Sequence, residues 1–335
     1  MTVANQNPVR NNTRKKILEM ILRFQGYLGL LIVFLIGLLF SPVRDGSNLF
    51  IDPINQANIL RDVAETGIIA VGMTFVILVG EIDLSVGSVL ALSATVSAAL
   101  LVRLNLGTEL VIPIGLLVGG LAGLINGVVT TAVRIPSFVV TLAMMSFARG
   151  FARLTLGGLA IPVIAGAGGA PDSFFIFAQR WFGIPVPAIV MLAVAIVSGI
   201  VLRFTAFGRH IYAVGGNSVA ARLSGVRVDS VRIIVFVVCS VLTALAGMIH
   251  AAQLNQGSPN DGVGYELNAI AAVVIGGTSL QGGIGSLAGS IIGAWMLGMI
   301  DNILGLNNIN SDVQLLIKGA LIVAAVGLQR LHRRA

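Results

Sequence analysis

The chain has 335 residues, of which 56% are hydrophobic and only 10% are charged, and its formal net charge is +7. Soluble globular domains carry about 25% charged residues, so this composition, with a mean hydropathy of +0.96, argues strongly against a soluble domain. It indicates a protein embedded in membrane lipid. The fold class we expect is an all-α polytopic membrane protein, because helices pair their backbone polar groups internally.

About ten apolar runs approach the roughly 20 residues that a membrane-spanning helix needs. They lie near residues 24–40, 59–80, 84–102, 110–131, 137–156, 186–203, 231–252, 267–280, 284–304 and 312–328. The pair 267–280 and 284–304 is also compatible with one re-entrant element plus one span. We therefore expect a cytoplasmic leader (1–23), a single transmembrane domain (24–328) and a cytoplasmic tail (329–335).

The basic residues between the expected spans are distributed unequally between the two sides of the membrane. If the N-terminus is cytoplasmic, the cytoplasmic segments hold Arg10, Arg14, Lys15, Lys16, Arg23, Arg134, Arg203, Arg209, Arg222, Arg227, Arg232, Arg330, Arg333 and Arg334, and the outer segments hold Arg44, Arg61, Arg103 and Arg180. This distribution satisfies the positive-inside rule. It predicts a multi-pass membrane protein with both termini cytoplasmic, and it explains the positive charge without a nucleic-acid partner.

Two segments half a chain apart carry nearly the same glycine spacing. Gly119-Gly-Leu-Ala-Gly123-Leu-Ile-Asn-Gly127 and Gly285-Ser-Leu-Ala-Gly289-Ser-Ile-Ile-Gly293 share six of nine residues, and Gly115 extends the first ladder. On a helix, glycines four residues apart form a stripe where a second backbone packs closely. The match indicates a duplication, although coincidence in a chain rich in Gly, Leu and Ala is the alternative.

Five spans in each half, about 24–156 and 186–328, would give two inverted five-helix repeats, because an odd number of crossings reverses the second half. This arrangement is common in transporters, where the substrate path lies between the halves.

The segment 203–232 is the longest polar stretch between spans. Asn217 or Ser218 is suited to cap a short helix that runs through Leu223, and Gly225 is suited to end it. A short cytoplasmic helix rich in small residues favours docking into a cleft of a partner. A solvated connector is the alternative.

Five charged residues are candidates for a path or gate. Glu81 and Asp83 fall in the tight connection after the second expected span, where Asp83 can either cap the following helix or take part in gating. Arg149 and Arg153 lie one helical turn apart toward the outer end of the fifth span, so they either line an outer vestibule or extend to the interface. Lys318, in the last span, is the fifth.

Lys318 is expected either to pair with Asp301 or Asp312 near the outer side or to reach a water-filled path. Structural pairing is the favoured interpretation.

No pattern for chemistry or for a cofactor is present. His210, His250 and His332 are scattered without metal-ligand spacing, and no phosphate-binding glycine loop precedes a lysine. We therefore expect no cofactor, no metal and no catalytic residues, which disfavours an integral-membrane enzyme.

Several motifs together resemble a known family. They are Gly80-Glu81-Ile82-Asp83-Leu84-Ser85-Val86-Gly87, Phe207-Gly208-Arg209, Tyr212-Ala213-Val214-Gly215-Gly216-Asn217, Ala220-Ala221 followed by Gly225, and Gly276-Gly277-Thr278-Ser279-Leu280-Gln281-Gly282-Gly283. From about Asn58 to Gly327 the chain resembles the monosaccharide permeases, of ribose, xylose and arabinose type, of ATP-binding-cassette importers in the branched-chain amino acid/sugar permease superfamily. Val219 stands where the usual coupling loop of such importers has glutamate.

The resemblance implies the ten-helix fold of the cobalamin importer group and a chain that works with partners. These would be a second permease chain, identical or a close paralogue, a cytoplasmic cassette ATPase, a periplasmic sugar-binding protein and the membrane lipid. The ATPase-coupling residues would include Gly208, Arg209, Gly215, Gly216, Asn217, Ala220, Ala221 and Gly225. The function expected is import of a monosaccharide or related small polar solute, with ATP hydrolysis on the separate partner. An ion-gradient-driven secondary carrier is the alternative.

Overall fold

The computed structural model describes residues 25–44, 46–166 and 169–334, with the backbone alone for 156, 325, 326 and 328–334. The predicted leader, residues 1–23, lies outside these ranges. The last helix continues to Arg334, so the residues expected to form a separate tail from 329 onward extend the final helix instead.

The chain is mostly helical. The helices are α2 (Gln25–Phe40), α3 (Pro53–Leu78), α4 (Val86–Val102), α5 (Thr108–Ala132), α6 (Ser137–Leu156), the 3-10 helix η1 (Asp172–Ala178), α7 (Val186–Phe204), α8 (Ala206–Gly216), α9 (Ser218–Leu223), α10 (Val228–Leu254), α11 (Tyr265–Ile275), α12 (Leu287–Leu306) and α13 (Ser311–Arg334). Short strands form three antiparallel pairs, β1 (Val43–Arg44) with β2 (Ser47–Asn48), β3 (Ile161–Pro162) with β6 (Gln256–Gly257), and β4 (Arg180–Trp181) with β5 (Ile184–Pro185).

Five helices of the described chain are long and apolar enough to cross a membrane, namely α5, α6, α7, α10 and α12. Three shorter helices, α2, α4 and α11, are also apolar. Together they make the chain a multi-pass membrane protein.

Helix α5 shows how lipid reverses the usual polarity of a surface helix. Its glycines face inward, whereas large apolar side chains point away from the protein and are exposed, as Leu117, Leu121, Leu124 and Val128 illustrate. In water such a surface would promote aggregation, but in lipid it is solvated.

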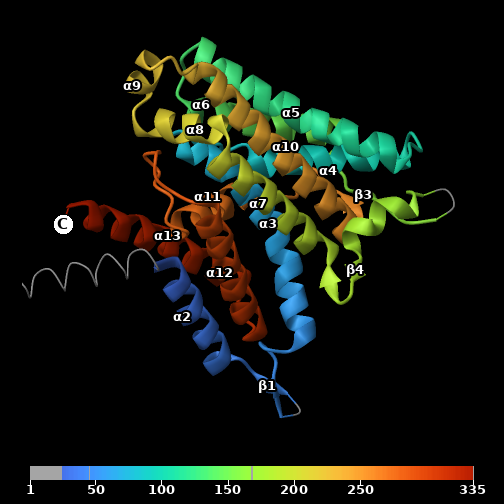
Figure 1. The fold of residues 1–335 in the computed structure, drawn as a ribbon. Helices are drawn as coiled ribbons and strands as arrows, with labels where there is room; N and C mark the ends of the chain where they lie inside the picture. The colour runs from blue at the N-terminus through green and yellow to red at the C-terminus, as the bar shows by residue number, and fades with distance from the viewer. Residues whose placement is uncertain (1–24, 45, 167–168, 335) are drawn as a thin grey trace, which may run out of the picture.

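Helices α3 and α10 pack together at the centre of the bundle (Figure 1). Helix α5 packs against α10, and α12 packs against α3. Helix α4 contacts α5, α6 and α10, while α11 contacts α12, α13 and α3. Every residue of α3 from 67 to 78 is buried, so α3 is enclosed by protein on all sides over this length.

The two ends of the bundle differ. Helices α8 and α9 and the end of α13 lie at one end, which we call the α8–α9 end, and the labelled strands β1, β3 and β4 lie toward the opposite side, the hairpin end (Figure 1). The strand pairs close the connections between helices at the hairpin end, because short antiparallel ribbons pair backbone groups that helices leave free.

Local signals explain most helix boundaries. The Asp52 carboxylate accepts hydrogen bonds from the first backbone N–H groups of α3, and the Ser286 hydroxyl does the same for α12. Gly157 and Asn255 end α6 and α10 in the left-handed conformation. The span expected over 267–280 corresponds to α11, which begins two residues earlier and ends five residues earlier, before the glycine-rich loop that starts at Gly276.

Candidate functional site

A buried hydrogen-bonded network joins three helices toward the hairpin end. The Glu65 carboxylate, on α3, accepts a hydrogen bond from the Tyr265 hydroxyl (2.8 Å) and lies 2.8 Å from Nδ1 of His250, on α10. His250 Nε2 lies 3.5 Å from the Asp261 carboxylate in the loop that precedes α11. Only 5% of Glu65 and 8% of His250 are exposed, so the network places ionisable groups inside the protein core, where they need one another. We call these four residues the His250 network.

Helix α6 also contacts the loop that contains Asp261. Arg149 Nη1 donates hydrogen bonds to the backbone carbonyls of Pro259 (2.7 Å) and Asp261. One turn further along, Arg153 Nη2 donates to the Asn260 side chain (3.1 Å). Both arginines therefore contact the 255–264 loop, as two residues on one helix face should, and they fasten it to α6.

A cavity of about 180 Å³ lies between α3, α11 and α12. Its polar lining is Asp62, Thr66, Asn268, Asp301 and Asn302, and its apolar lining is Ile59, Val63, Ala294, Leu297 and Gly298. We call it the α3–α12 cavity. Lys318 Nζ, on α13, lies 2.9 Å from Oδ2 of Asp301, so of the two acids considered as its partner the structure pairs it with Asp301.

Asp83 and Glu81, in the connection from α3 to α4, have different surroundings. Asp83 is fully buried, and its Oδ1 accepts hydrogen bonds from the backbone N–H (2.8 Å) and hydroxyl (2.6 Å) of Ser85. Its Oδ2 has no hydrogen-bond partner among the described residues. Glu81 instead forms an ion pair with Arg232 at the start of α10 (3.0 Å).

Asp83 was predicted as a possible cap of the following helix, but the N-cap residue of α4 is Ser85. Asp83 instead accepts a hydrogen bond from the Ser85 hydroxyl and so orients that serine. Burial raises the pKa of the Asp83 carboxyl above its ordinary value of 3.8, and the hydrogen bonds from Ser85 oppose this only in part.

Three elements meet backbone to backbone near the α8–α9 end. The backbone N–H of Gly283, in the α11–α12 loop, donates to the carbonyl of Leu78 at the end of α3 (2.9 Å). A Cβ added to Gly215 of α8 would overlap the same carbonyl, and one added to Gly282 would come within 2.8 Å of the Gly80 nitrogen. Only glycine permits this approach. We call the meeting of Gly80, Gly215, Gly282 and Gly283 the glycine junction.

Tyr212 adds a side-chain link, because its hydroxyl donates to the carbonyl of Gly285 (3.0 Å). Helix α8 is thereby attached to both loops that follow buried helices, the α3–α4 connection and the α11–α12 connection. Any displacement of α8 must move these loops with it.

The short helix predicted in the segment 203–232 is confirmed as α9. The Asn217 side chain accepts hydrogen bonds from the N–H groups of Val219 and Ala220 (both 3.0 Å), and Gly225 follows the helix with φ of +88°. Gly208 lies against the backbone at the end of α7, where a Cβ would overlap Leu202. The capping residue and the glycine predicted from the sequence therefore mark the two ends of this helix.

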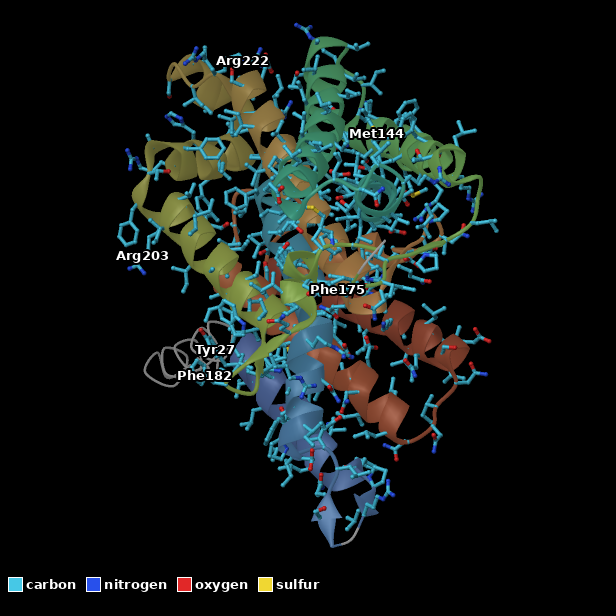
Figure 2. All side chains as sticks on the ribbon, turned by 90° about the vertical axis from the view of Figure 1, so that its right-hand side faces the viewer. Tyr27, Met144, Phe175, Phe182, Arg203 and Arg222 are labelled. Carbon is cyan, nitrogen blue, oxygen red and sulfur yellow. The ribbon has the colours of Figure 1, made fainter. Side chains whose placement is uncertain are left out.

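The exposed surface of this segment is basic and partly apolar. Val219 and Leu223 of α9 are 69% and 85% exposed. The segment also carries the exposed cations Arg203, Arg209, Arg222 and Arg227, of which Arg222 pairs with Asp229 (2.8 Å), and Gly216 and Ala220 are exposed as well. Figure 2 shows Arg203 and Arg222 at the surface of this part of the molecule.

Ala221 departs from the expectation that it seats in a partner. It is only 5% exposed and packs in the core of its own chain. The exposed side chains of α9 that a partner could reach are those of Val219, Ala220, Arg222 and Leu223.

The first glycine ladder packs α5 against α10. A Cβ on Gly119, Gly123 or Gly127 would meet the α10 backbone near Ser240, Phe236 or Ile233, and one on Gly115 would meet the side chains of Met248 and Ser97.

The second ladder has a different partner. Gly289 and Gly293 of α12 approach the backbone of α11 near Gly276 and Ala272, and Gly285 precedes the helix and faces Thr278. The two ladders thus provide close approach in both halves, but against different neighbours.

Sequence reasoning missed the His250 network. Glu65 is an acid inside an apolar run, which is a signal for an intramembrane functional group. Its partner His250 lies 185 residues away along the chain, and no local pattern connects the two.

Comparison with known proteins assigns the chain to a family. The family model described as "Branched-chain amino acid transport system / permease component" matches residues 55–326. A ribose import permease protein of Haemophilus influenzae is 44% identical over 273 residues, covering 81% of this chain and 84% of the relative. The ribose import permease protein of Bacillus subtilis is 41% identical, with 91% of each chain covered, and an L-arabinose ABC transporter permease protein of Azospirillum brasilense is 37% identical, with 91% and 88% covered.

No solved structure matches the chain. The family match nevertheless extends from the start of α3 into α13, and so includes the His250 network, the glycine junction and α8–α9. The chain belongs to the permease-component family of branched-chain amino acid transport systems, and its role is therefore transport rather than catalysis.

Proposed function

We propose that this chain is the membrane-spanning permease subunit of an ATP-driven importer for a monosaccharide or a related small polar solute. The relatives named as ribose and arabinose permeases support the substrate class. In this proposal two permease chains, identical or close paralogues, enclose the path in a bacterial inner membrane. A cytoplasmic cassette ATPase binds the α8–α9 end, and a periplasmic binding protein delivers the solute at the hairpin end. Both termini are cytoplasmic.

The observation that carries the proposal is the attachment of α9 and α8 to the transmembrane core. Helix α9 exposes two large apolar side chains, Val219 and Leu223, among arginines, which suits contact with an acidic-rimmed apolar groove. Helix α8 then connects this surface, through the glycine junction, to the loops after α3 and α11. A partner that moves α9 would thus shift the inner ends of the path.

The packing pattern supports ten spans in two inverted five-helix repeats. If α2–α6 correspond to α7 and α10–α13, then the contacts of α5 with α10 and of α4 with α10 have counterparts in those of α12 with α3 and of α11 with α3. The contacts of α4 with α6 and of α11 with α13 correspond in the same way. Such exchanged contacts are what an inverted repeat generates.

A second candidate is a secondary carrier driven by an ion gradient. The His250 network favours it, because a proton-coupled carrier requires titratable groups within the membrane. Glu65 nevertheless binds both His250 and Tyr265 and so joins three helices, which is equally what a purely structural contact would do.

The test is uptake by vesicles that contain the chain with its cassette ATPase. Radiolabelled ribose and arabinose are supplied outside, each with the binding protein, and ATP is enclosed within the vesicles. We expect accumulation that requires ATP and the binding protein and is unchanged by a protonophore. Accumulation by the chain alone, driven by a pH gradient without ATP, would establish the carrier instead.

A further inference from the structure

The α3–α12 cavity presents polar side chains where a lipid-facing surface would be apolar. Asp62 lies nine residues after the start of α3 and Asp301 five residues before the end of α12, so both are roughly 8–14 Å below the helix ends on the hairpin side. The Asp62 side chain is 65% exposed at this depth. Hydrocarbon cannot solvate a carboxylate, so this cavity faces water or another chain.

Charges around the cavity are balanced by neighbours on the same chain. Asp62 pairs with Arg61 (3.2 Å) and Asp301 pairs with Lys318 (2.9 Å). Asn302 exchanges two hydrogen bonds with Asn55 (2.8 and 3.0 Å). The acids therefore carry no surplus charge for a cation, and the site suits a neutral ligand.

Several polar atoms at the cavity remain available. The Asp301 Oδ1 atom is buried and has no hydrogen-bond partner among the described residues. Thr66 and Asn268 also line the cavity, and their side chains make no hydrogen bond to the part of the chain that the structure describes. Together they offer a carboxylate acceptor, a hydroxyl, and an amide with both donor and acceptor.

The apolar lining completes the chemistry. Val63, Ala294 and Leu297 form an apolar wall, and α12 approaches α3 so closely at Gly298 that a Cβ there would overlap Val63. A sugar ring has hydroxyls at its rim and C–H groups on its faces, which matches a wall of this kind beside three polar groups. The cavity volume of about 180 Å³ is smaller than the roughly 300–1,000 Å³ of sites that bind drug-sized ligands. A ligand as small as a single sugar ring matches this smaller volume.

We propose that the α3–α12 cavity is a transit site for one neutral monosaccharide in the outer half of the path, with Thr66, Asn268 and Asp301 binding its hydroxyls. The inference rests on the proposed function and names where that function handles its solute. A branched-chain amino acid does not fit the same groups, because its ammonium and carboxylate would need unpaired charges of both signs.

The experiment uses cysteine accessibility in the assembled importer. The single natural cysteine, Cys239, is buried, so an introduced cysteine reports alone. Thr66→Cys and Asn268→Cys test the cavity. Ser47→Cys, in the exposed hairpin, is the water-accessible control, and Leu192→Cys, on the exposed apolar face of α7, is the lipid-facing control. The probe is a small charged methanethiosulfonate added to the hairpin side.

We expect both cavity cysteines to react at a rate within about tenfold of Ser47→Cys and Leu192→Cys to remain unmodified. During ATP-driven turnover, whichever pentose, ribose or arabinose, supports uptake should slow modification of the cavity cysteines at least fivefold. Empty binding protein and leucine should not slow it, and Ser47→Cys should be unaffected by either pentose. Absence of modification, or modification that the pentose does not slow, overturns the proposal.

Uptake by the importer without substitutions separates the two claims. If it accumulates neither pentose, the proposed function fails in its substrate class. If it accumulates one of them and the cavity cysteines are not protected, only the transit site fails. As a second measurement, Asn268→Leu should lower the uptake rate about tenfold at an unchanged amount of chain in the membrane, equivalent to about 1.4 kcal/mol. Unchanged uptake by Asn268→Leu also counts against the site.

Discussion

Replacement of Gly123 by alanine tests whether α5 and α10 are in backbone contact. A Cβ at this position would overlap the carbonyl of Phe236 and come within 2.7 Å of the Val237 Cα atom. Both are main-chain atoms of α10, which cannot rotate away as a side chain does. The helices must therefore separate, and the contacts along the rest of the stripe weaken with them.

Gly120 is the matched control, because it lies on the same helix and a Cβ there would reach only Val241 Cγ2, at 3.4 Å. Alanine is favoured over glycine in a helix interior by about 1 kcal/mol at both positions, so this gain cancels in the comparison. What remains is the overpacking at Gly123, about 1–3 kcal/mol. Gly123→Leu should be worse than Gly123→Ala, whereas the opposite face of α5 already carries exposed Leu121.

The measurement is thermal unfolding in detergent, followed with a thiol-reactive fluorogenic maleimide. Cys239 is completely buried in α10, so it reacts only when the bundle opens. We expect Gly120→Ala to unfold at or above the temperature of the unsubstituted chain and Gly123→Ala several degrees below it. Equal unfolding temperatures for the two variants would refute backbone contact at Gly123.

Three further predictions follow from the other sites. Two substitutions test α9: Leu223→Asp places a charge on its exposed apolar surface, and Gly225→Val strains a residue held at φ of +88° by about 1–2 kcal/mol. Each should abolish uptake and reduce co-purification of the ATPase, while the chain still inserts in the membrane. Full uptake by both variants would show that α9 is only a connector. Glu65→Leu leaves Nδ1 of buried His250 without its hydrogen-bond partner and should lower the free energy of unfolding by about 3–5 kcal/mol. Adding His250→Leu should recover part of this loss in the same maleimide assay. Strictly additive losses in the two single variants and the double variant would contradict a coupled pair. Because burial raises the pKa of Asp83, its contribution to stability is present below its ordinary value of 3.8 and is lost as pH rises through the raised value. The stability of Asp83→Asn relative to the unsubstituted chain should therefore increase as pH rises above 3.8, and a pH-independent difference would refute this.

Much of the helical architecture follows from the sequence, because each helix is a local structure. Ten apolar runs correspond in position to α2–α7 and α10–α13, with boundaries that shift by a few residues. Where a capping residue or glycine decides the boundary, as for α9, the prediction was close. It failed at the expected span over 267–280, since hydropathy alone does not reveal that the chain leaves the helix at Gly276.

The candidate sites divide in the same way. Lys318 could be assigned to an acid near the outer side from its place in the last span, but only the packing of α13 selects Asp301. Ala221 and Ala220 are identical residues side by side in the sequence, and tertiary structure alone buries the first and exposes the second.

What the sequence determined by itself was what depends on neighbours along the chain: membrane character, helix positions, and the stripe of glycines that allows close packing. What only the tertiary structure decided was which distant groups meet. Glu65 with His250, Asp62 with Asp301 across one cavity, and Gly215 with Gly283 are joined by the arrangement of α3, α8, α10 and α12. Helix formation depends on interactions over about four residues, whereas these contacts depend on how whole helices pack, which no local pattern encodes.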